Sequence, residues 1–269
     1  MRDKEAFEML MRFIFGSEKR YLQSKAIFKN SKFYKINENG RKVEINCGDL
    51  IEEFDGKKIV WKNTFGFGGS DIKVCEIINH KIVYQSNTYD IKDFLDIIDE
   101  RKSIWLIQEF INQHEILNTF NNSSVNTMRI LTYNTGERVV FGNAVLRFGK
   151  EGSCVDNCDR GGYYYGISDS GTVGDDMFSF TEKMRYKCPH ASIIIPFFKE
   201  ALELVIETHN HIPQLFSVGL DIVITSDGPM ILEGNDGWDP YLSQTPLGYA
   251  QRNLWNILSA ERNSIIGNN

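Results

Sequence analysis

The sequence predicts an α+β protein built from two mixed lobes that divide near residue 112. Strand and helix signals do not alternate strictly along the chain, as they would in a doubly wound parallel sheet. The middle of the chain is rich in strand signals, and the clearest long helix is a single segment at 192–211. Two mixed lobes account for this order better than one alternating sheet.

Residues 1–57 are expected to form a short N-terminal region. Apolar residues at helical spacing predict a helix over 2–24. From 26 to 45, short apolar runs alternate with Asn, Lys and Gly, which predicts an irregular hairpin. This region is expected to precede the two main lobes.

The small lobe is expected to span residues 58–112. Strands are predicted at 58–62 and 71–77, and a helix at 90–101. A largely apolar segment, 103–111, then predicts a buried strand that ends the lobe.

The large lobe is expected to span residues 113–269. A hairpin is predicted over 127–148, with its turn at Asn134-Thr135-Gly136. The Gly-rich segment 149–162 is too long for a tight turn, and loops of that length in compact domains tend to be functional or disordered. A second hairpin at 218–235 is expected to complete the lobe.

Composition narrows the class of protein. The 269 residues are 42% hydrophobic and 25% charged, as in ordinary globular proteins. A net charge of −6 argues against general nucleic-acid binding. No run approaches the roughly 20 apolar residues of a membrane span, so we expect no integral membrane segment and a cytoplasmic location. The odd number of scattered cysteines does not resemble a disulfide framework; they are Cys47, Cys75, Cys154, Cys158 and Cys188.

The hairpin at 218–235 is the strongest candidate for a metal site. Asp221 lies on its first strand, and Glu233 and Asn235 on its second. Three oxygen ligands without nearby His or Cys suit a hard cation such as Mg²⁺. A three-residue loop at Ser226-Asp227-Gly228 pairs Asp221 with Glu233, whereas a two-residue loop would put them on opposite faces. An exposed hairpin with one polar side is the alternative.

Lys62 ends a predicted strand and is followed by the Gly-rich run Asn63–Ser70. A cation and open backbone N–H groups together suit phosphate binding. The run is not a P-loop, because it returns into a strand instead of opening a helix. A flexible β-turn is the competing interpretation.

The strand Trp105–Ile111 is apolar except for Gln108 and Glu109, and His114 and Glu115 follow it. A buried strand that carries an acid needs a partner for that acid. A hinge whose backbone meets a purine edge provides one explanation. A strand end that rises to the surface provides another.

Arg129 and Arg147 lie on the two strands of the 127–148 hairpin. If the turn is regular, both side chains can face one cleft. The planar guanidinium suits phosphate or carboxylate recognition, although surface ion pairs are the usual fate of strand arginines.

In this order, the segments resemble the ATP-grasp superfamily, and most closely its sugar-transfer-associated members. The resemblance covers roughly residues 58–245. The motifs that carry it are Lys62 with the glycine run, Gln108-Glu109 with His114, Ser124-Val125-Asn126-Thr127-x-Arg129, Val155-Asp156-Asn157 with Gly161-Gly162, Gly219-x-Asp221, Glu233-Gly234-Asn235 and Gln244.

This resemblance implies an ATP-grasp fold, in which two antiparallel sheets sandwich ATP. It implies that Lys62 contacts phosphate under a flap containing Gly66, Gly68, Gly69 and Ser70. Gln108, Glu109 and the backbone of Phe110 and Ile111 would meet the adenine, and either His114 or Glu115 the ribose. A second ATP-binding lysine is expected upstream, either Lys25 or Lys29.

The resemblance also assigns the catalytic parts. Asp221, Glu233 and Asn235 would hold one or two Mg²⁺ ions, and Arg129 and Arg147 would steady the transferred phosphoryl group. The loop Val155–Gly162 would close on the substrate. The expected substrate contacts are Asn126, Asp156, Asn157, Gly161 and Gly162.

The activity implied is that of an ATP- and Mg²⁺-dependent carboxylate–amine ligase acting through an acylphosphate. By the resemblance, its partners are a small-molecule or glycan carboxylate and an amine, in polysaccharide or glycan modification. A uronic acid is one candidate carboxylate, and an amino acid or amino sugar a candidate amine. An ATP-grasp kinase and a non-catalytic nucleotide-binding protein are the alternatives, and the oligomeric state is left open.

Overall fold

A computed structural model describes residues 3–37, 40–65, 72–98 and 104–247. The glycine run expected to form a phosphate flap, including Gly66, Gly68, Gly69 and Ser70, lies outside these residues.

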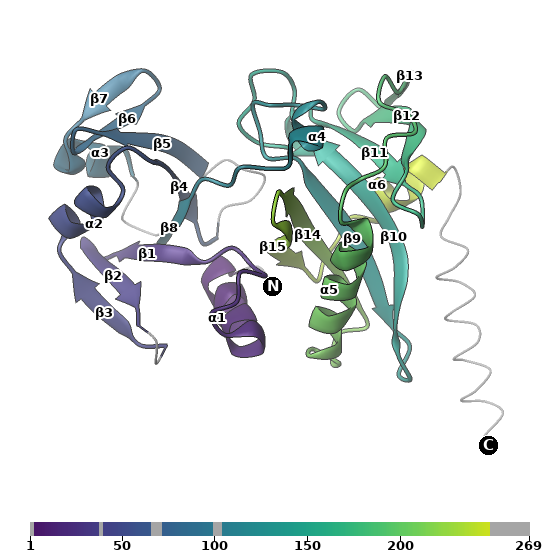
Figure 1. Ribbon diagram of the computed structural model, residues 1–269, viewed down its shortest axis with the longest axis horizontal. Coiled ribbons are helices and arrows are strands. Elements are labelled where there is room, and N and C mark those ends of the chain that lie inside the picture. The colour runs from purple at the N-terminus through teal and green to yellow at the C-terminus, as the bar shows by residue number, and fades with distance from the viewer. Residues whose placement is uncertain (1–2, 38–39, 66–71, 99–103, 248–269) are drawn as a thin grey trace. The chain divides into compact units, whose positions relative to one another are not determined.

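The chain forms two compact units, each built on one antiparallel sheet (Figure 1). The first unit contains residues 2–13 and 22–111, and the second contains residues 14–21 and 112–269. The α+β class and the two antiparallel sheets are therefore confirmed. Among the described residues, no helix has the length and apolar character needed to span a membrane.

The first unit has an eight-stranded sheet. The sequence prediction separated residues 1–57 from 58–112, but this sheet runs through both segments. In sheet order its strands are β3 (Lys42–Ile45), β2 (Lys32–Ile36), β1 (Ser24–Lys29), β8 (Trp105–Glu109), β4 (Lys58–Asn63), β5 (Ile72–Ile78), β6 (Lys81–Tyr84) and β7 (Asn87–Tyr89).

Aromatic packing on one face of this sheet forms the core of the first unit. The Trp61 ring is fully buried, with its centroid 5.4 Å from that of Phe94 and 6.0 Å from that of Phe28. Phe94 comes from α3 (Ile91–Ile97), and α2 (Cys47–Glu53) contributes Leu50. Burial of rings of this size supplies much of the stabilisation of a small core.

Helix α1 (Lys4–Phe15) is shorter than the predicted helix over 2–24. Gly16 follows it with a φ of 62°, a left-handed conformation that ends helices and favours glycine. The apolar spacing alone does not contain this stop signal.

The second unit has a seven-stranded sheet. In sheet order its strands are β13 (Met184–Lys187), β12 (Val173–Ser179), β11 (Tyr163–Ile167), β10 (Val139–Phe148), β9 (Thr127–Asn134), β14 (Ser217–Thr225) and β15 (Gly228–Asn235). Its helical segments are α4 (Glu115–Asn118), η2 (Cys158–Arg160), α5 (Phe198–Asn210), α6 (Pro240–Gln244) and η3 (Thr245–Leu247).

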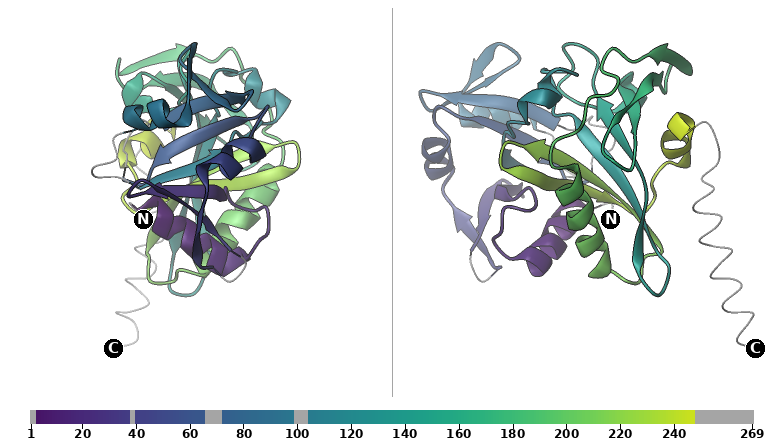
Figure 2. Two further views of the ribbon diagram at one scale, coloured as in Figure 1. Left: turned by 90° about the vertical axis from the view of Figure 1, so that its left-hand side faces the viewer. Right: turned by 45° about the vertical axis from the view of Figure 1, so that its right-hand side comes forward.

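The two faces of the second sheet differ in character. Side chains alternate along a strand, so Met128, Ile130 and Thr132 share one face of β9, and Thr127 and Arg129 lie on the other. Helix α5 lies along the sheet (Figure 2) and contacts the first face through Thr132. The polar side chains of the 127–148 hairpin are therefore left on the face opposite α5.

Helix α5 begins at Phe198, six residues later than the predicted start at residue 192. Pro196 precedes it, and Phe197 has a left-handed φ of 54°. The residue before a proline disfavours helical backbone dihedral angles. The helix therefore cannot start within the segment that includes Ile195 and Pro196.

A buried histidine joins α5 to the sheet. The Thr132 hydroxyl lies 2.8 Å from His209 Nδ1, and His209 Nε2 lies 2.9 Å from the Leu215 carbonyl oxygen. A carbonyl can only accept, so Nε2 carries the proton and Nδ1 accepts from Thr132. Burial lowers the pKa of His209, and the hydrogen bond to Leu215 offsets this in part.

Protonation of His209 is expected to destabilise the fold. Because the folded pKa lies below the unfolded value of about 6.5, stability is complete above about pH 6.5 and falls as pH decreases through the folded pKa. His209→Leu is expected to cost about 1–3 kcal/mol at neutral pH, because it leaves buried partners unpaired, and to flatten the acid dependence. Urea unfolding between pH 5 and pH 8 measures both effects; an equally steep acid dependence in the variant would contradict this assignment.

Candidate functional site

The hairpin of β14 and β15 pairs Asp221 with Glu233. The three-residue loop expected to produce this pairing is wrong, because Thr225 pairs with Gly228 across a two-residue loop. The register then shifts by one residue between Ile222 and Asp221. This bulge returns the two carboxylates to the same face, which a two-residue loop alone would not do.

The extra residue of the bulge is Leu232. Ile222 pairs with Ile231 and Asp221 with Glu233, so Leu232 has no direct partner across the strands. Its side chain is half-buried. Asn235 lies two residues after Glu233 and therefore shares its face.

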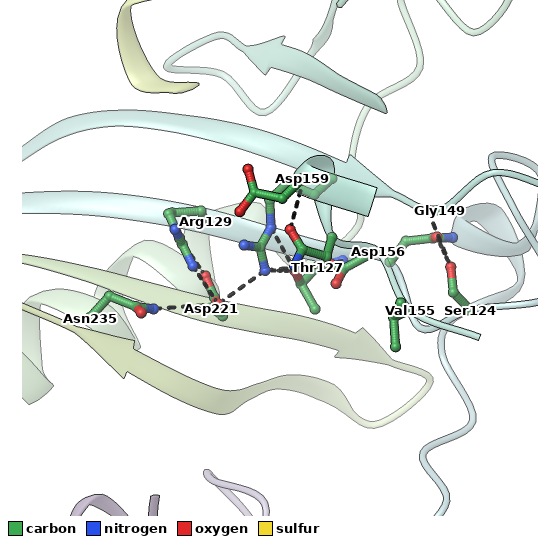
Figure 3. A network of polar contacts seen from close by, with 12 residues as sticks. Ser124, Thr127, Arg129, Gly149, Val155, Asp156, Asp159, Asp221 and Asn235 are labelled. Atoms are coloured by element: carbon green, nitrogen blue, oxygen red, sulfur yellow. Dashed lines mark hydrogen bonds and ion pairs between the residues drawn. The ribbon is translucent and has the colours of Figure 1, made fainter. Parts of the chain in front are cut away.

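Two arginines bind Asp221 on this face. Arg129 is bidentate: its Nε lies 2.7 Å from Asp221 Oδ1, and its Nη2 lies 2.8 Å from Asp221 Oδ2. Arg147 Nη2 donates to Asp221 Oδ2 at 3.0 Å, and Asn235 Nδ2 donates to the same oxygen at 3.5 Å. Figure 3 shows these groups in one network. The two predicted catalytic arginines thus meet one predicted metal ligand.

Burial makes this charge cluster strong. The side chains of Asp221, Arg147 and Arg129 are 6%, 12% and 13% exposed. Burial opposes the charge of Arg147, but the carboxylates of Asp221 and Asp156 outweigh it and raise the pKa of the guanidinium. A guanidinium group does not lose its proton in proteins, so both arginines are cations held on central strands of the sheet.

Asp156 extends the network into the loop after β10. Its Oδ2 accepts hydrogen bonds from the Thr127 hydroxyl and, at 3.2 Å, from the Thr127 backbone N–H. Arg147 Nη2 lies 3.5 Å from Asp156 Oδ2 and 2.6 Å from Thr127 Oγ1. Thr127 therefore links Asp156 to the arginines.

The loop that carries Asp156 is held in one shape by its own backbone. Asn157 Oδ1 accepts from the backbone N–H of Asp159 at 2.9 Å. Gly161 has a left-handed φ of 83°, and a Cβ on Gly162 would lie 2.8 Å from the carbonyl oxygen of Asn157. Asn157, Gly161 and Gly162, expected to contact substrate, are seen here to shape the loop.

Asn126, which is also expected to contact substrate, is held by hydrogen bonds within the protein. It is fully buried, and its Nδ2 donates to the carbonyl oxygens of Leu117 and Asn121, both at 2.7 Å. The Ser124 hydroxyl donates to its Oδ1 at 3.2 Å. These internal bonds fix Asn126 at the start of β9.

The first unit holds a second group of predicted residues. Lys62 and Gln108 are buried and lie on neighbouring strands, β4 and β8. Gln108 Nε2 donates to Ser24 Oγ at 3.3 Å, and Ser24 Oγ donates to the buried Glu8 at 2.5 Å. Burial raises the pKa of Glu8, and hydrogen bonds from Ser24 oppose this.

Glu109 lies beside two lysines of the same unit. Its carboxylate oxygens are 3.6 Å from Lys25 Nζ and 3.9 Å from Lys57 Nζ. Lys29 pairs with Lys32 at the other end of β1. Of the two lysines proposed as a second ATP contact, Lys25 is therefore the one beside the predicted adenine-binding segment.

The residues after Glu109 divide between the units. The backbone N–H of Phe110 donates to the Lys58 carbonyl oxygen at 3.1 Å, and Ile111 ends the first unit. His114 belongs to the second unit, where its Nδ1 accepts from the Ile116 N–H at 3.2 Å and caps α4. Glu115 is exposed in the first turn of α4.

Thr127, Ser24 and Glu8 are parts of these networks that the sequence interpretation did not assign to a site. Thr127 stands in the motif Ser124-Val125-Asn126-Thr127, which was the signal for it. Glu8 and Ser24 lie 16 positions apart and carry no local motif, so only the fold brings them together.

The donor set on β14 and β15 suits a hard cation. The described residues include no group of three or more His, Cys, Asp or Glu side chains placed to hold a metal. Asp221 and Glu233 with the amide oxygen of Asn235 supply three oxygens, which is typical of an open Mg²⁺ site completed by water or phosphate. Arg129 donates to Asp221 Oδ1, and a carboxylate oxygen has two lone pairs, so the arginine and a cation can share this group.

The sequence profile of the family described as sugar-transfer associated ATP-grasp matches residues 19–254. The chain belongs to this family. Comparison of this ATP-grasp protein with curated proteins gives no match.

Solved structures similar to this ATP-grasp protein are distant. D-alanine–D-alanine ligase from Bacillus anthracis is 10% identical, with a TM-score of 0.49 over 100% of this chain and 69% of that one. N5-carboxyaminoimidazole ribonucleotide synthetase from Thermotoga maritima is 10% identical, with a TM-score of 0.46 over 87% of this chain and 41% of that one. D-cycloserine synthetase DcsG is 13% identical, with a TM-score of 0.47 over 91% and 64%. The chain thus spans less than half of the Thermotoga enzyme.

Asp221→Asn is expected to destabilise the protein by about 3–5 kcal/mol, because it removes the charge that compensates two buried guanidinium groups. Urea unfolding with and without the substitution measures this loss. Glu203→Gln is the matched control, because its ion pair with Lys199 is surface-exposed and is expected to contribute less than about 1 kcal/mol. Similar losses in the two variants would contradict the importance of the buried cluster.

Proposed function

We propose that this protein is an ATP- and Mg²⁺-dependent ligase that joins a carboxylate to an amine through an acylphosphate. The observation that carries the proposal is the cluster of Arg129, Arg147, Asp221 and Glu233 on one face of the second sheet. Family membership supports the use of ATP by this cluster.

The two arginines suit phosphoryl transfer. Catalysis of this reaction depends mainly on positioning and on neutralising charge on the transferred group. Arg129 and Arg147 are cations fixed by Asp221 before any ligand binds, so little reorganisation is needed when negative charge arrives. Their role is to orient and stabilise the transferred phosphoryl group.

Asp221, Glu233 and Asn235 are the residues that would hold Mg²⁺. When bound, Mg²⁺ neutralises charge on the phosphate oxygens and orients them. The cross-strand pairing of Asp221 with Glu233 supports this assignment, since it places both carboxylates on the arginine face.

The nucleotide contacts are proposed from the family resemblance. Lys62, Gly66, Gly68, Gly69 and Ser70 would contact phosphates. Gln108, Glu109, Phe110 and Ile111 would meet the adenine, with Lys25 beside them and His114 or Glu115 at the ribose. The burial of Lys62 and Gln108 on adjacent strands supports this half of the assignment.

The reaction has two steps. A substrate carboxylate oxygen attacks the γ-phosphorus of ATP, the bond to the β-phosphate oxygen breaks, and ADP leaves. The amine nitrogen then attacks the acyl carbon, and phosphate leaves with the electron pair of the broken C–O bond. The products are an amide, ADP and inorganic phosphate.

The family description links the protein to sugar transfer. On that basis the carboxylate is a uronic acid or related glycan acid, the amine is an amino acid or amino sugar, and the reaction belongs to polysaccharide or glycan modification in the cytoplasm.

ADP release is expected only when ATP, Mg²⁺, a carboxylate and an amine are all present. A panel of D-glucuronate and D-galacturonate with L-alanine and glucosamine tests this in a coupled assay. Glu233→Ala is expected to lower the rate by about 100-fold or more, since it removes a charge that would hold the metal. Glu137→Ala, at an exposed turn, is the matched control and is expected to keep the parent rate.

Other products would favour other functions. AMP and pyrophosphate, or no amine-dependent turnover, would exclude the proposed ligase. A stable phosphorylated sugar formed without amine would identify a kinase, which could use the same cluster. ATP binding without turnover in the parent would indicate a non-catalytic nucleotide-binding protein.

A further inference from the structure

Asp156 has one carboxylate oxygen bound by the protein and one available for a ligand. Oδ2 receives both hydrogen bonds from Thr127 and the contact with Arg147. Within the described part of the chain, no residue donates a hydrogen bond to Oδ1. The side chain is 17% exposed, so it is mostly enclosed with one accessible edge.

Asp156 lies next to the place assigned to the phosphoryl group. A single nitrogen, Nη2 of Arg147, lies 3.5 Å from Asp156 Oδ2 and 3.0 Å from Asp221 Oδ2. A phosphoryl group held by Arg147 would therefore have Asp156 as a neighbour. Figure 3 shows Asp156 and Asp221 as parts of the same network.

The surroundings of Asp156 suit a proton acceptor. Burial raises the pKa of its carboxyl group, Arg147 and the Thr127 hydrogen bond oppose the rise, and Asp221 adds to it. Arg129 and Cys158 are the other titratable groups near it, and burial raises the pKa of the Cys158 thiol to about 12, so that thiol stays neutral. A carboxylate with a raised pKa accepts a proton more readily than an exposed one.

The position of Asp156 is preorganised. The carbonyl oxygen of its neighbour Asn157 accepts hydrogen bonds from the backbone N–H groups of Arg160 and Gly162 at 3.1 and 3.2 Å. Asn121 Nδ2 donates to the Gly149 carbonyl oxygen at 2.9 Å, which fixes the other end of the loop. Oδ1 is thus presented by a fixed backbone, as positioned acid–base groups require.

We propose that Asp156 is the catalytic base of the ligation step, with Oδ1 binding the attacking amine and accepting its proton. The inference rests on the proposed ligase function and assigns the amine a subsite on the 149–162 loop. It also specifies an amine that arrives as an ammonium ion, because a carboxylate recognises that cation directly.

The proton balance of this step is complete. Asp156 Oδ1 removes one proton from the ammonium group, and the freed lone pair forms the C–N bond at the acyl carbon. The C–O bond to phosphate breaks, and phosphate takes both its electron pair and the second proton lost by nitrogen. Protonated Asp156 then returns its proton to water.

Comparison of two nucleophiles tests the role. With D-glucuronate or D-galacturonate, Asp156→Asn is expected to lower amide formation with L-alanine or glucosamine by about 100-fold or more. Hydroxylamine is uncharged at neutral pH, so hydroxamate formation by the variant is expected to stay close to the parent rate. The amide oxygen of the substituted side chain can still accept the Thr127 hydrogen bonds, so the loop is retained.

A second variant of the same loop serves as the control for Asp156→Asn. Asp159→Asn changes an exposed carboxylate of the same loop and is expected to leave both reactions unchanged. If Asp156→Asn lowers both reactions equally, or neither, Asp156 is not the base and the ligase proposal stands. If the parent releases no ADP with any acid and nucleophile, the ligase proposal fails, and this inference fails with it.

Discussion

The attachment of Arg129 and Arg147 to Asp221 is the interaction on which the organisation of the second unit depends. Two buried guanidinium groups next to each other repel, and burial of either without a counter-charge is costly. Asp221 removes both costs with one side chain and thereby ties β9 and β10 to β14 on the polar face of the sheet. The apolar face, covered by α5, can then pack as an ordinary core. The cluster thus contributes to the fold and holds two cations on one face of the sheet.

A one-residue bulge determines whether this arrangement includes a second carboxylate. If Leu232 stayed in the regular register, Glu233 would project toward the face of the sheet that packs on α5. The bulge therefore places Glu233 on the face of Arg129 and Arg147 at the expense of strand regularity. The 149–162 loop also depends on special positions. Gly161 and Gly162 stand where a larger residue would be strained, and the resulting loop conformation fixes Asp156 beside Arg147.

Local signals in the sequence predicted much of this fold, and long-range contacts explain what they missed. Strand signals identified the hairpin of β9 and β10, and the glycine-containing turn Asn134-Thr135-Gly136 marked the connection between its strands. The pairing of Asp221 with Glu233 was predicted from a wrong loop length, because no local signal announces a bulge at Leu232. Asn126 carries a family motif, but whether a motif residue faces a ligand or a core depends on neighbours distant in sequence. The role of Asp221 as partner to both arginines depends on contacts across 92 and 74 positions.

The division of the second sheet into two chemically different faces has a consequence for how such a protein can diversify. The buried arginines and carboxylates stand on β9, β10, β14 and β15, whereas Asp156 stands on a connection between β10 and β11. Connections tolerate insertion and replacement far better than central strands do. A new acceptor could therefore be accommodated by rebuilding the loop while the charged strands remain untouched. In this architecture the charged strands and the loop that connects them can evolve at different rates within one unit.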